Sequence, residues 1–209
     1  MNITFYADNV DPRIPEMQKK VFETLGMTIH QIKPTKWEGH GGVIDGWLRG
    51  NIDALDENEI IILWDIDCIP LNAQIIEEAI KDAGQYKLVG IAQKASHIPN
   101  SIIYAGPAFL AFSIKTYKAL GCPTFACTNR SDCAAELTYV AREKGVEVRL
   151  LYPSHVEKPM WQLDGPVMFG KGTTFGNNDI YHAFYSRKGN EQMFLKKCED
   201  VIKRHEQAM

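Results

Sequence analysis

The sequence lacks the features of several specialised protein classes. Its five cysteines are odd in number, and no pair has the two-residue spacing of a zinc knuckle. It therefore predicts neither a fully paired disulfide framework nor a cysteine zinc site, and we expect reduced thiols, several of them buried. No segment approaches the ~18 apolar residues that cross a bilayer. The first ten residues, MNITFYADNV, also lack the basic stretch and apolar run of a signal peptide. We expect a cytoplasmic protein without a transmembrane segment.

Positive charge is not in excess. The chain has 23 Lys and Arg against 26 Asp and Glu, and its formal net charge is −3. This balance gives no electrostatic reason to expect nucleic-acid binding. The 209 residues are 45% hydrophobic and show no repeat or linker, which fits one globular domain. An acidic protein that binds phosphates must supply positive charge locally, through a metal or a few Lys and Arg.

Strand-like and helix-like segments alternate along the chain, which predicts an α/β domain with a central, mostly parallel sheet flanked by helices. Predicted strands cover about 3–7, 27–32, 60–64, 87–92, 108–112 and 146–152, and predicted helices about 12–25, 43–55, 72–83, 115–120, 132–144 and 190–207. Residues 60–64, IIILW, are continuously apolar, which indicates a central strand covered on both faces. Pro70 is expected to close this strand. Residues 159–181 are rich in Gly, Pro, Asn and Thr, and are expected to form loops with short strands.

Two carboxylates, Asp65 and Asp67, directly follow the strongest strand. Ligands of open α/β sheets bind at the carboxyl ends of strands, and side chains two apart on an extended segment point the same way. The pair can therefore converge on one Mg²⁺ or Mn²⁺, which prefers oxygen ligands and would bridge the protein to a diphosphate. The structural alternative is a polar strand end that caps a neighbouring helix or turn.

Two enzyme classes place a DxD motif after such a strand. In haloacid-dehalogenase-type phosphatases the first aspartate, here Asp65, is the nucleophile, but the motif lies near the N-terminus and is followed by a small residue and Thr or Val. Here Asp67 precedes Cys68-Ile69-Pro70, a strand-helix-strand unit precedes the motif, and no later pair of acids matches that family's second metal motif. The phosphatase remains the alternative.

The other class is the GT-A-fold glycosyltransferases, which the chain resembles over most of its length, as a compact viral or bacterial type. Four segments occur in the family's order. TFYADN (4–9) resembles the strand that binds the donor base, and GHGGVIDGWL (39–48) resembles the His-Gly-x-x-x-Asp segment upstream of the metal motif. ILWDIDCIPL (62–71) resembles the DxD strand with its following proline. YHAFYSR (181–187) resembles the late segment whose histidine completes the metal shell.

The resemblance assigns roles to particular residues. Asp67 would bind Mn²⁺ or Mg²⁺ directly, Asp65 would bind it through water or hold the ribose, and His182 would be the third ligand. The remaining donor-binding residues would be Tyr6, Ala7, Asp8 and Asn9 at the base and ribose, His40 at the sugar or phosphate, and Arg187 and Lys188 at the diphosphate. Asp45 would hydrogen-bond donor-sugar hydroxyls.

On the acceptor side, the resemblance implies a catalytic carboxylate at Asp132 or Glu136. It also places residues 104–108 beside the donor sugar, with Trp161, Asp164 and His155 as weaker candidates. Simpler structural roles remain open for these positions: a core aromatic for Tyr6, a core histidine for His182, surface charge for Arg187 and Lys188, and helix capping for Asp45 and Asp132.

The implied protein is a single GT-A-like, Rossmann-type domain over 1–209, with a nucleotide-binding part in about 1–100 and an acceptor part in about 101–209. It would be a metal-dependent, hexosyltransferase-like enzyme that moves a sugar from a nucleoside-diphosphate donor, a UDP-sugar, to a hydroxyl of a glycan or another acceptor. A sugar-nucleotide-binding protein without turnover is a further alternative.

Overall fold

A six-stranded sheet forms the centre of the protein. The computed structural model describes residues 1–186 and 189–208. The strands of this sheet are β1 (Asn2–Phe5), β2 (Ile29–Ile32), β3 (Ile60–Trp64), β5 (Leu88–Gln93), β6 (Tyr104–Ser113) and β7 (Val148–Leu151). They lie in the order β2-β1-β3-β6-β5-β7. Only β6 runs antiparallel to its neighbours, which confirms the predicted α/β class with a mostly parallel sheet.

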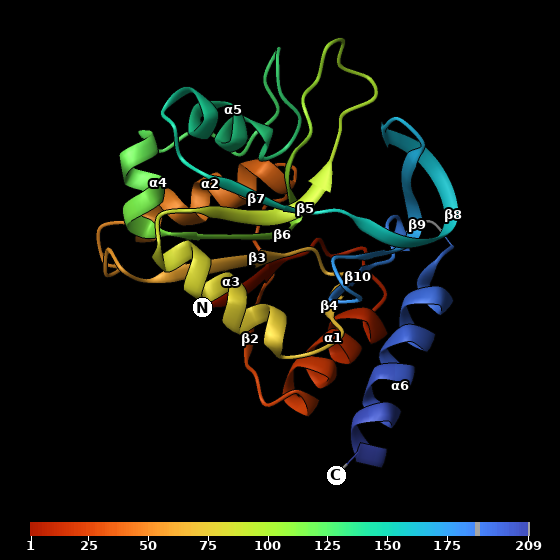
Figure 1. The fold of residues 1–209 in the computed structure, drawn as a ribbon. Coiled ribbons are helices and arrows are strands. Elements are labelled where there is room, and N and C mark those ends of the chain that lie inside the picture. The colour runs from red at the N-terminus through yellow and green to blue at the C-terminus, as the bar shows by residue number, and fades with distance from the viewer. Residues whose placement is uncertain (187–188, 209) are drawn as a thin grey trace.

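Helices cover both faces of this sheet (Figure 1). One face packs against α2 (His40–Asn51), α4 (Ile114–Leu120) and α5 (Ala135–Glu143), and the other against α1 (Arg13–Thr24) and α3 (Gln74–Gly84). Strand β3 contributes to both cores because its side chains alternate: Ile61 and Leu63 face the first layer, and Ile62 and Trp64 the second. The prediction of a central strand covered on both faces is confirmed.

A second, smaller sheet stands beside the first, and it corrects two predictions. It contains β4 (Cys68–Pro70), β8 (Pro153–Asp164), β9 (Val167–Phe175) and β10 (Ile180–His182), in the order β4-β10-β9-β8. Residue Pro70 therefore does not close the strand of 60–64; it ends a separate strand, β4. Residues 159–181 are not mainly loop either, since most of them belong to the β8–β9 hairpin and β10.

The β8–β9 hairpin escaped prediction because its pairing is irregular. The register between the two strands shifts at three points, which breaks the two-residue alternation that marks a strand. Gly170 lies opposite Pro159, where an added Cβ would come within 2.7 Å of the Met160 nitrogen. A glycine is therefore needed where the two backbones approach closely.

Three element boundaries near the site also differ from the predictions. Helix α2 begins at His40 rather than near residue 43, because Gly41 and Gly42 are helical instead of interrupting the chain. Strand β6 begins at Tyr104, so residues 104–108 belong to it. Helix α5 begins at Ala135, after Asp132.

The last helix, α6 (Glu191–Ala208), packs on α1 at the side of the molecule (Figure 1). Its buried stripe includes the predicted Phe194, Cys198, Val201 and Ile202. All five cysteines are free, and Cys68 and Cys198 are buried. Within the described residues, no helix combines the length and apolar character needed to cross a membrane.

Candidate metal and nucleotide site

The site lies where two parallel neighbours end. Strand β1 ends at Phe5 and β3 at Trp64, so the chain leaves both strands at the same edge of the sheet. A cavity of about 520 Å³ opens there. Its lining comes from the segments after β1 and β3, the start of α2, the end of β5 and the segment after β10: Phe5, Tyr6, Ala7, Asn9, Val10, Trp37, His40, Asp65, Ile66, Asp67, Gln93, His182, Phe184, Tyr185 and Ser186.

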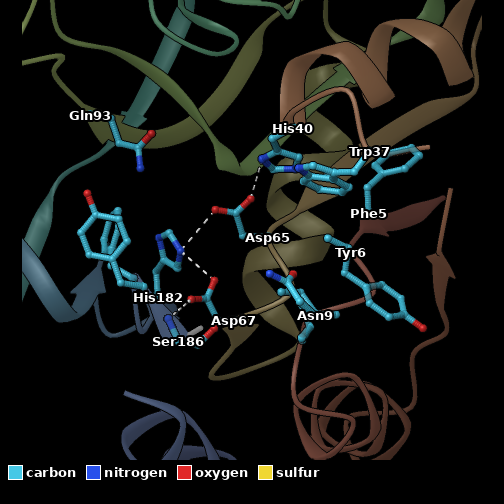
Figure 2. Close-up of a pocket in the computed structure, with 15 residues that line it drawn as sticks. Phe5, Tyr6, Asn9, Trp37, His40, Asp65, Asp67, Gln93, His182 and Ser186 are labelled. Atoms are coloured by element: carbon cyan, nitrogen blue, oxygen red, sulfur yellow. Dashed lines mark hydrogen bonds and ion pairs between the residues drawn. The ribbon is translucent and has the colours of Figure 1, made fainter. Parts of the chain in front are cut away.

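Three side chains converge at the inner wall of this cavity (Figure 2). The Nε2 atom of His182 lies 3.1 Å from Oδ1 of Asp67 and 3.3 Å from Oδ2 of Asp65. Each of the three offers a ligand atom, and these atoms lie within 4.8 Å of one another. His182 reaches the carboxylates because β10 pairs with β4, where His182 lies opposite Cys68. The fold therefore brings the predicted metal residues together across 115 positions of sequence.

Several contacts fix Asp65. Its N–H donates to the Ala108 carbonyl at 3.1 Å, and its own carbonyl accepts from Nε2 of the buried Gln18 at 2.8 Å. Its side chain contacts two imidazoles, since Nδ1 of His40 lies 3.0 Å from Oδ1 on the side opposite His182. His40 thus orients the Asp65 side chain, while its predicted contact with the donor stays a prediction.

The segment after β10 wraps around Asp67. The Ser186 N–H donates to Oδ2 of Asp67 at 3.1 Å, and the Ala183 N–H donates to its carbonyl oxygen at 3.0 Å. Asp67 and His182 are almost fully buried, whereas Asp65 is about a quarter exposed at its side chain. Asp65 is therefore the member of the cluster that faces the open cavity. Ser186 was missed by sequence reasoning, because a backbone donor leaves no mark on the residue type.

The negative carboxylates of Asp65 and Asp67 lie close to the imidazole of His182, and the carboxylates and the imidazole shift one another's pKa. Burial would raise the pKa of both carboxyls, but His40 and His182 together lower that of Asp65, and His182 chiefly lowers that of Asp67. Burial would lower the pKa of His182, yet the two carboxylates raise it to about 9. The two carboxylates thus hold a proton on the imidazole of His182, which lies between them. Two carboxylates and one imidazole form a donor set that suits Mn²⁺ and can serve Mg²⁺.

The end of the cavity beside the start of α2 has an aromatic wall that sequence reasoning missed. The Trp37 ring stacks on His40, with ring centroids 6.3 Å apart and planes 16° apart, and Phe5 lies beside them (Figure 2). Trp37 comes from the loop before α2, where no periodic pattern indicates the direction of a side chain. The one available signal was its position three residues before His40.

The segment after β1 is only partly placed as predicted. Tyr6, Ala7 and Asn9 line the cavity, but the Tyr6 ring points away from Asp65 and Asp67 (Figure 2) and packs against the core between α1 and α6. Asp8 does not line the cavity. Its side chain is 80% exposed and pairs with Nζ of Lys33 at 2.6 Å. The prediction that Asp8 faces the nucleotide does not fit this geometry, because residue 8 lies in a turn beyond the end of β1, where strand alternation no longer applies.

Asp45 has a structural role, because its side chain binds the loop of residues 124–126. Its carboxylate accepts hydrogen bonds from the Thr124 hydroxyl, from the Phe125 N–H at 2.8 Å and from the Ala126 N–H at 3.3 Å. It lines neither the cavity described above nor the second one below. Asp45 therefore holds the 124–126 loop against α2, and this geometry does not fit the predicted catalytic or sugar-binding role.

A second cavity, of about 220 Å³, adjoins the first and shares Gln93, Phe184 and Tyr185 with it. Asp132 and Trp161 line it, as does Tyr104. Oδ1 of Asp132 accepts from the Cys133 N–H at 2.8 Å and from Sγ of Cys127 at 3.3 Å. Burial, followed by the nearby Asp132 carboxylate, raises the pKa of Tyr104.

Three remaining candidates that the structure describes, Glu136, His155 and Asp164, lie outside both cavities. Glu136 pairs with Arg130. Arg187 and Lys188 fall outside the described residues.

Comparison with known proteins identifies no family. No protein-family model matches the chain, and no curated protein matches it. Solved structures with a similar course of the chain include protein A197 from STIV, at 10% identity, 87% coverage of this chain, 94% of that one and a TM-score of 0.45. They also include a mutant of Drosophila β1,4-galactosyltransferase 7 in complex with manganese, UDP-Gal and xylobiose (15% identity, 92% and 79% coverage, TM-score 0.48). The catalytic domain of the same protein with xylobiose gives 14% identity, 92% and 79% coverage and a TM-score of 0.48. At these scores the likeness carries no argument about activity.

Proposed function

We propose that the chain is a metal-dependent glycosyltransferase that moves a sugar from a nucleoside-diphosphate donor, a UDP-sugar, to a hydroxyl of a glycan or another acceptor. The observation that carries the proposal is the convergence of Asp65, Asp67 and His182 at the inner wall of a 520 Å³ cavity. A cavity of that size at the carboxyl edge of an α/β sheet is where such domains bind nucleotides.

In this proposal Asp67 and His182 hold Mn²⁺ or Mg²⁺, and Asp65 contributes an oxygen from its cavity side. The bound ion would supply positive charge to the diphosphate, on which negative charge grows as the anomeric C–O bond breaks. His40 holds the Asp65 carboxylate, Ser186 holds the Asp67 carboxylate, and Gln18 holds the Asp65 backbone carbonyl. Because these contacts exist beforehand, the site need not reorganise as that charge develops. The residues therefore favour the transition state over the bound donor.

The base and ribose would lie between the segment after β1 and the wall formed by Trp37 and His40. An indole ring offers a stacking face for a base, and the Asn9 side chain offers both donors and an acceptor. Arg187 and Lys188 stay proposed partners of the diphosphate, on the strength of the sequence alone.

The second cavity is proposed to receive the acceptor. Asp132 reaches it from the loop before α5, and a carboxylate there would act as general base toward an acceptor hydroxyl. The division of the domain at about residue 100 stays a prediction, and the proposed site crosses it, because His182 lies after residue 100 and Gln93 before it.

The phosphatase alternative fits the geometry less well. Its nucleophile would be Asp65, yet both oxygens of that carboxylate contact imidazoles. Among the described residues, the side chain that joins Asp65 and Asp67 in a group of three metal-ligating side chains is the imidazole of His182 and not a further acid.

Calorimetric binding of UDP, with and without Mn²⁺, tests the proposal. Wild type should bind UDP with Mn²⁺, and Asp67→Asn should weaken that binding at least about 100-fold, because it removes a charged ligand without changing shape. The matched control is Asp53→Asn, at an exposed position near the end of α2. UDP-sugars are then screened for hydrolysis.

The alternatives give different results. A phosphoaspartate at Asp65 without affinity for UDP would indicate the phosphatase. Binding of UDP-sugars without hydrolysis or transfer would indicate a sugar-nucleotide-binding protein.

A further inference from the structure

Gln93, the last residue of β5, lies at the junction of the two cavities. It is one of three residues that line both, and the other two, Phe184 and Tyr185, are aromatic. Because β5 runs parallel to β1 and β3, its end emerges at the same edge of the sheet. Figure 2 shows the side chain reaching from this strand toward Asp65 and His182 across the cavity. A molecule that extends from Asp65 and His182 into the second cavity would therefore come close to this amide.

The backbone beside Gln93 is shaped to hold its side chain. Strands β5 and β6 lose regular register here: Gly90 pairs with Leu110 but Ile91 pairs with Gly106, which leaves residues 107–109 of β6 without partners in β5. A Cβ added at Gly106 would lie 2.7 Å from Cγ of Gln93 and still closer to its Cδ and Oε1. The missing side chain at position 106 therefore makes the space that the glutamine occupies.

The Gln93 side-chain amide has a defined position but no hydrogen-bond partner among the described residues. Its backbone pairs with Tyr104, while the described residues give its side-chain oxygen and nitrogen no hydrogen bond. The side chain is half-buried, and such polar groups usually have partners. An amide carries both donors and an acceptor and has no charge, so it suits a neutral hydroxyl group better than a phosphate.

We propose that Gln93 binds a hydroxyl of the transferred sugar at the junction between donor and acceptor, with Gly106 as the residue that makes room for it. This inference rests on the proposed function. In this inference the nucleotide contacts the aromatic wall and the metal, whereas the sugar contacts the Gln93 amide. Gln93 is then a residue that discriminates among donor sugars rather than among nucleotides.

The test compares UDP with UDP-glucose, UDP-galactose and UDP-N-acetylglucosamine by calorimetry with Mn²⁺. Gln93→Ala should leave the Kd of UDP within about twofold of wild type. It should weaken the best-bound UDP-sugar by about three- to tenfold, the loss expected for one neutral hydrogen bond. Gly106→Ala should have the same effect, because the added methyl group displaces the amide. Gln85→Ala and Gly84→Ala are the matched controls, since Gln85 is exposed and an added Cβ at Gly84 meets no atom within 4 Å.

A second readout does not depend on affinity. In the Mg²⁺-loaded protein, the side-chain ¹⁵N–¹H signals of Gln93, identified by their absence from the spectrum of Gln93→Ala, should shift more with the UDP-sugar than with UDP.

The outcomes separate this inference from the proposed function. If UDP binds but Gln93→Ala affects UDP and the UDP-sugars equally, or affects neither, the role of Gln93 is overturned while the nucleotide site stands. The same holds if its amide signals respond to UDP alone. If wild type does not bind UDP with Mn²⁺, the proposed function fails, and this inference fails with it.

Discussion

Binding of one metal ion at neutral pH should release close to one proton from the protein. The imidazole of His182 faces both carboxylates through Nε2, the atom that would bind the ion. The carboxylates outweigh the effect of burial and raise its pKa to about 9, so the metal-free protein carries the proton there at pH 7. A cation and a proton cannot share this nitrogen, and metal binding must therefore expel the proton.

The magnitude follows from the pKa. At two units below a pKa of about 9, roughly 99% of the imidazole is protonated, and the apparent metal affinity should rise about tenfold per pH unit. Between pH 7 and pH 9 the change would be about 50-fold, or ~2.3 kcal/mol, because half of the imidazole is still protonated at its pKa. The metal-free fold has the opposite dependence. A raised pKa in the folded state stabilises it fully below the unfolded value of 6.5, and this contribution is lost as the pH rises through about 9.

Calorimetric titration with Mn²⁺ at pH 7, in buffers that differ in ionisation enthalpy, counts the protons directly. Wild type should release about one, and His182→Gln should release close to none while binding the ion more weakly. His30→Gln, at an exposed position of β2, is the matched control. Release of no proton by wild type, or an affinity that does not change between pH 6.5 and 8, would show that His182 is not a ligand or is already neutral.

Three further predictions concern helix α2 and the loop before it. Gly41→Ala should destabilise the protein by about 1–3 kcal/mol in thermal unfolding, because its Cβ would press on the backbone of Phe125. Gly46→Ala in the same helix, where an added Cβ meets nothing within 4 Å, should instead stabilise by about 0.5–1 kcal/mol; equal effects would contradict the packing argument. Asp45→Ala should cost about 2–3 kcal/mol in urea unfolding, with the Kd of UDP unchanged, because three donors lose their acceptor; weaker UDP binding would return Asp45 to the site. Trp37→Ala should weaken UDP by about 1–2 kcal/mol in calorimetry and leave the Mn²⁺ titration unaltered, and unchanged UDP affinity would show that the base lies elsewhere.

The parts of the site that could be predicted follow from local pattern. An unbroken apolar run identifies β3 as central, and two carboxylates directly after it must emerge at the ligand-binding edge. His182 has no such local signal, because a histidine between Tyr181 and Ala183 looks like a core residue. Its place in a segment that resembles the late histidine segment of GT-A glycosyltransferases made it a candidate, and the pairing of β10 with β4 brings it to the carboxylates.

The sequence does not predict where side chains point when they lie outside helices and strands. Asp8 and Trp37 both lie in connecting segments, where neither a two-residue nor a 3.6-residue period applies. Packing decides the outcome: the indole covers apolar core beside α2, while Asp8 turns to solvent and pairs with Lys33. The space at Gly106 that holds the Gln93 side chain could not be predicted either. It depends on the irregular pairing that leaves three residues of β6 without partners in β5.

The position of the cluster between the two sheets has a consequence for local unfolding. Asp65 follows β3 in the first sheet, whereas Asp67 adjoins β4 and His182 ends β10 in the second. An ion bound by all three is lost whenever either sheet moves away from the other, so the second sheet cannot open without releasing it. Amide exchange in β4 and β10 should then slow with metal concentration to the same extent in both strands, as expected for one cooperative unit that closes on its ligand.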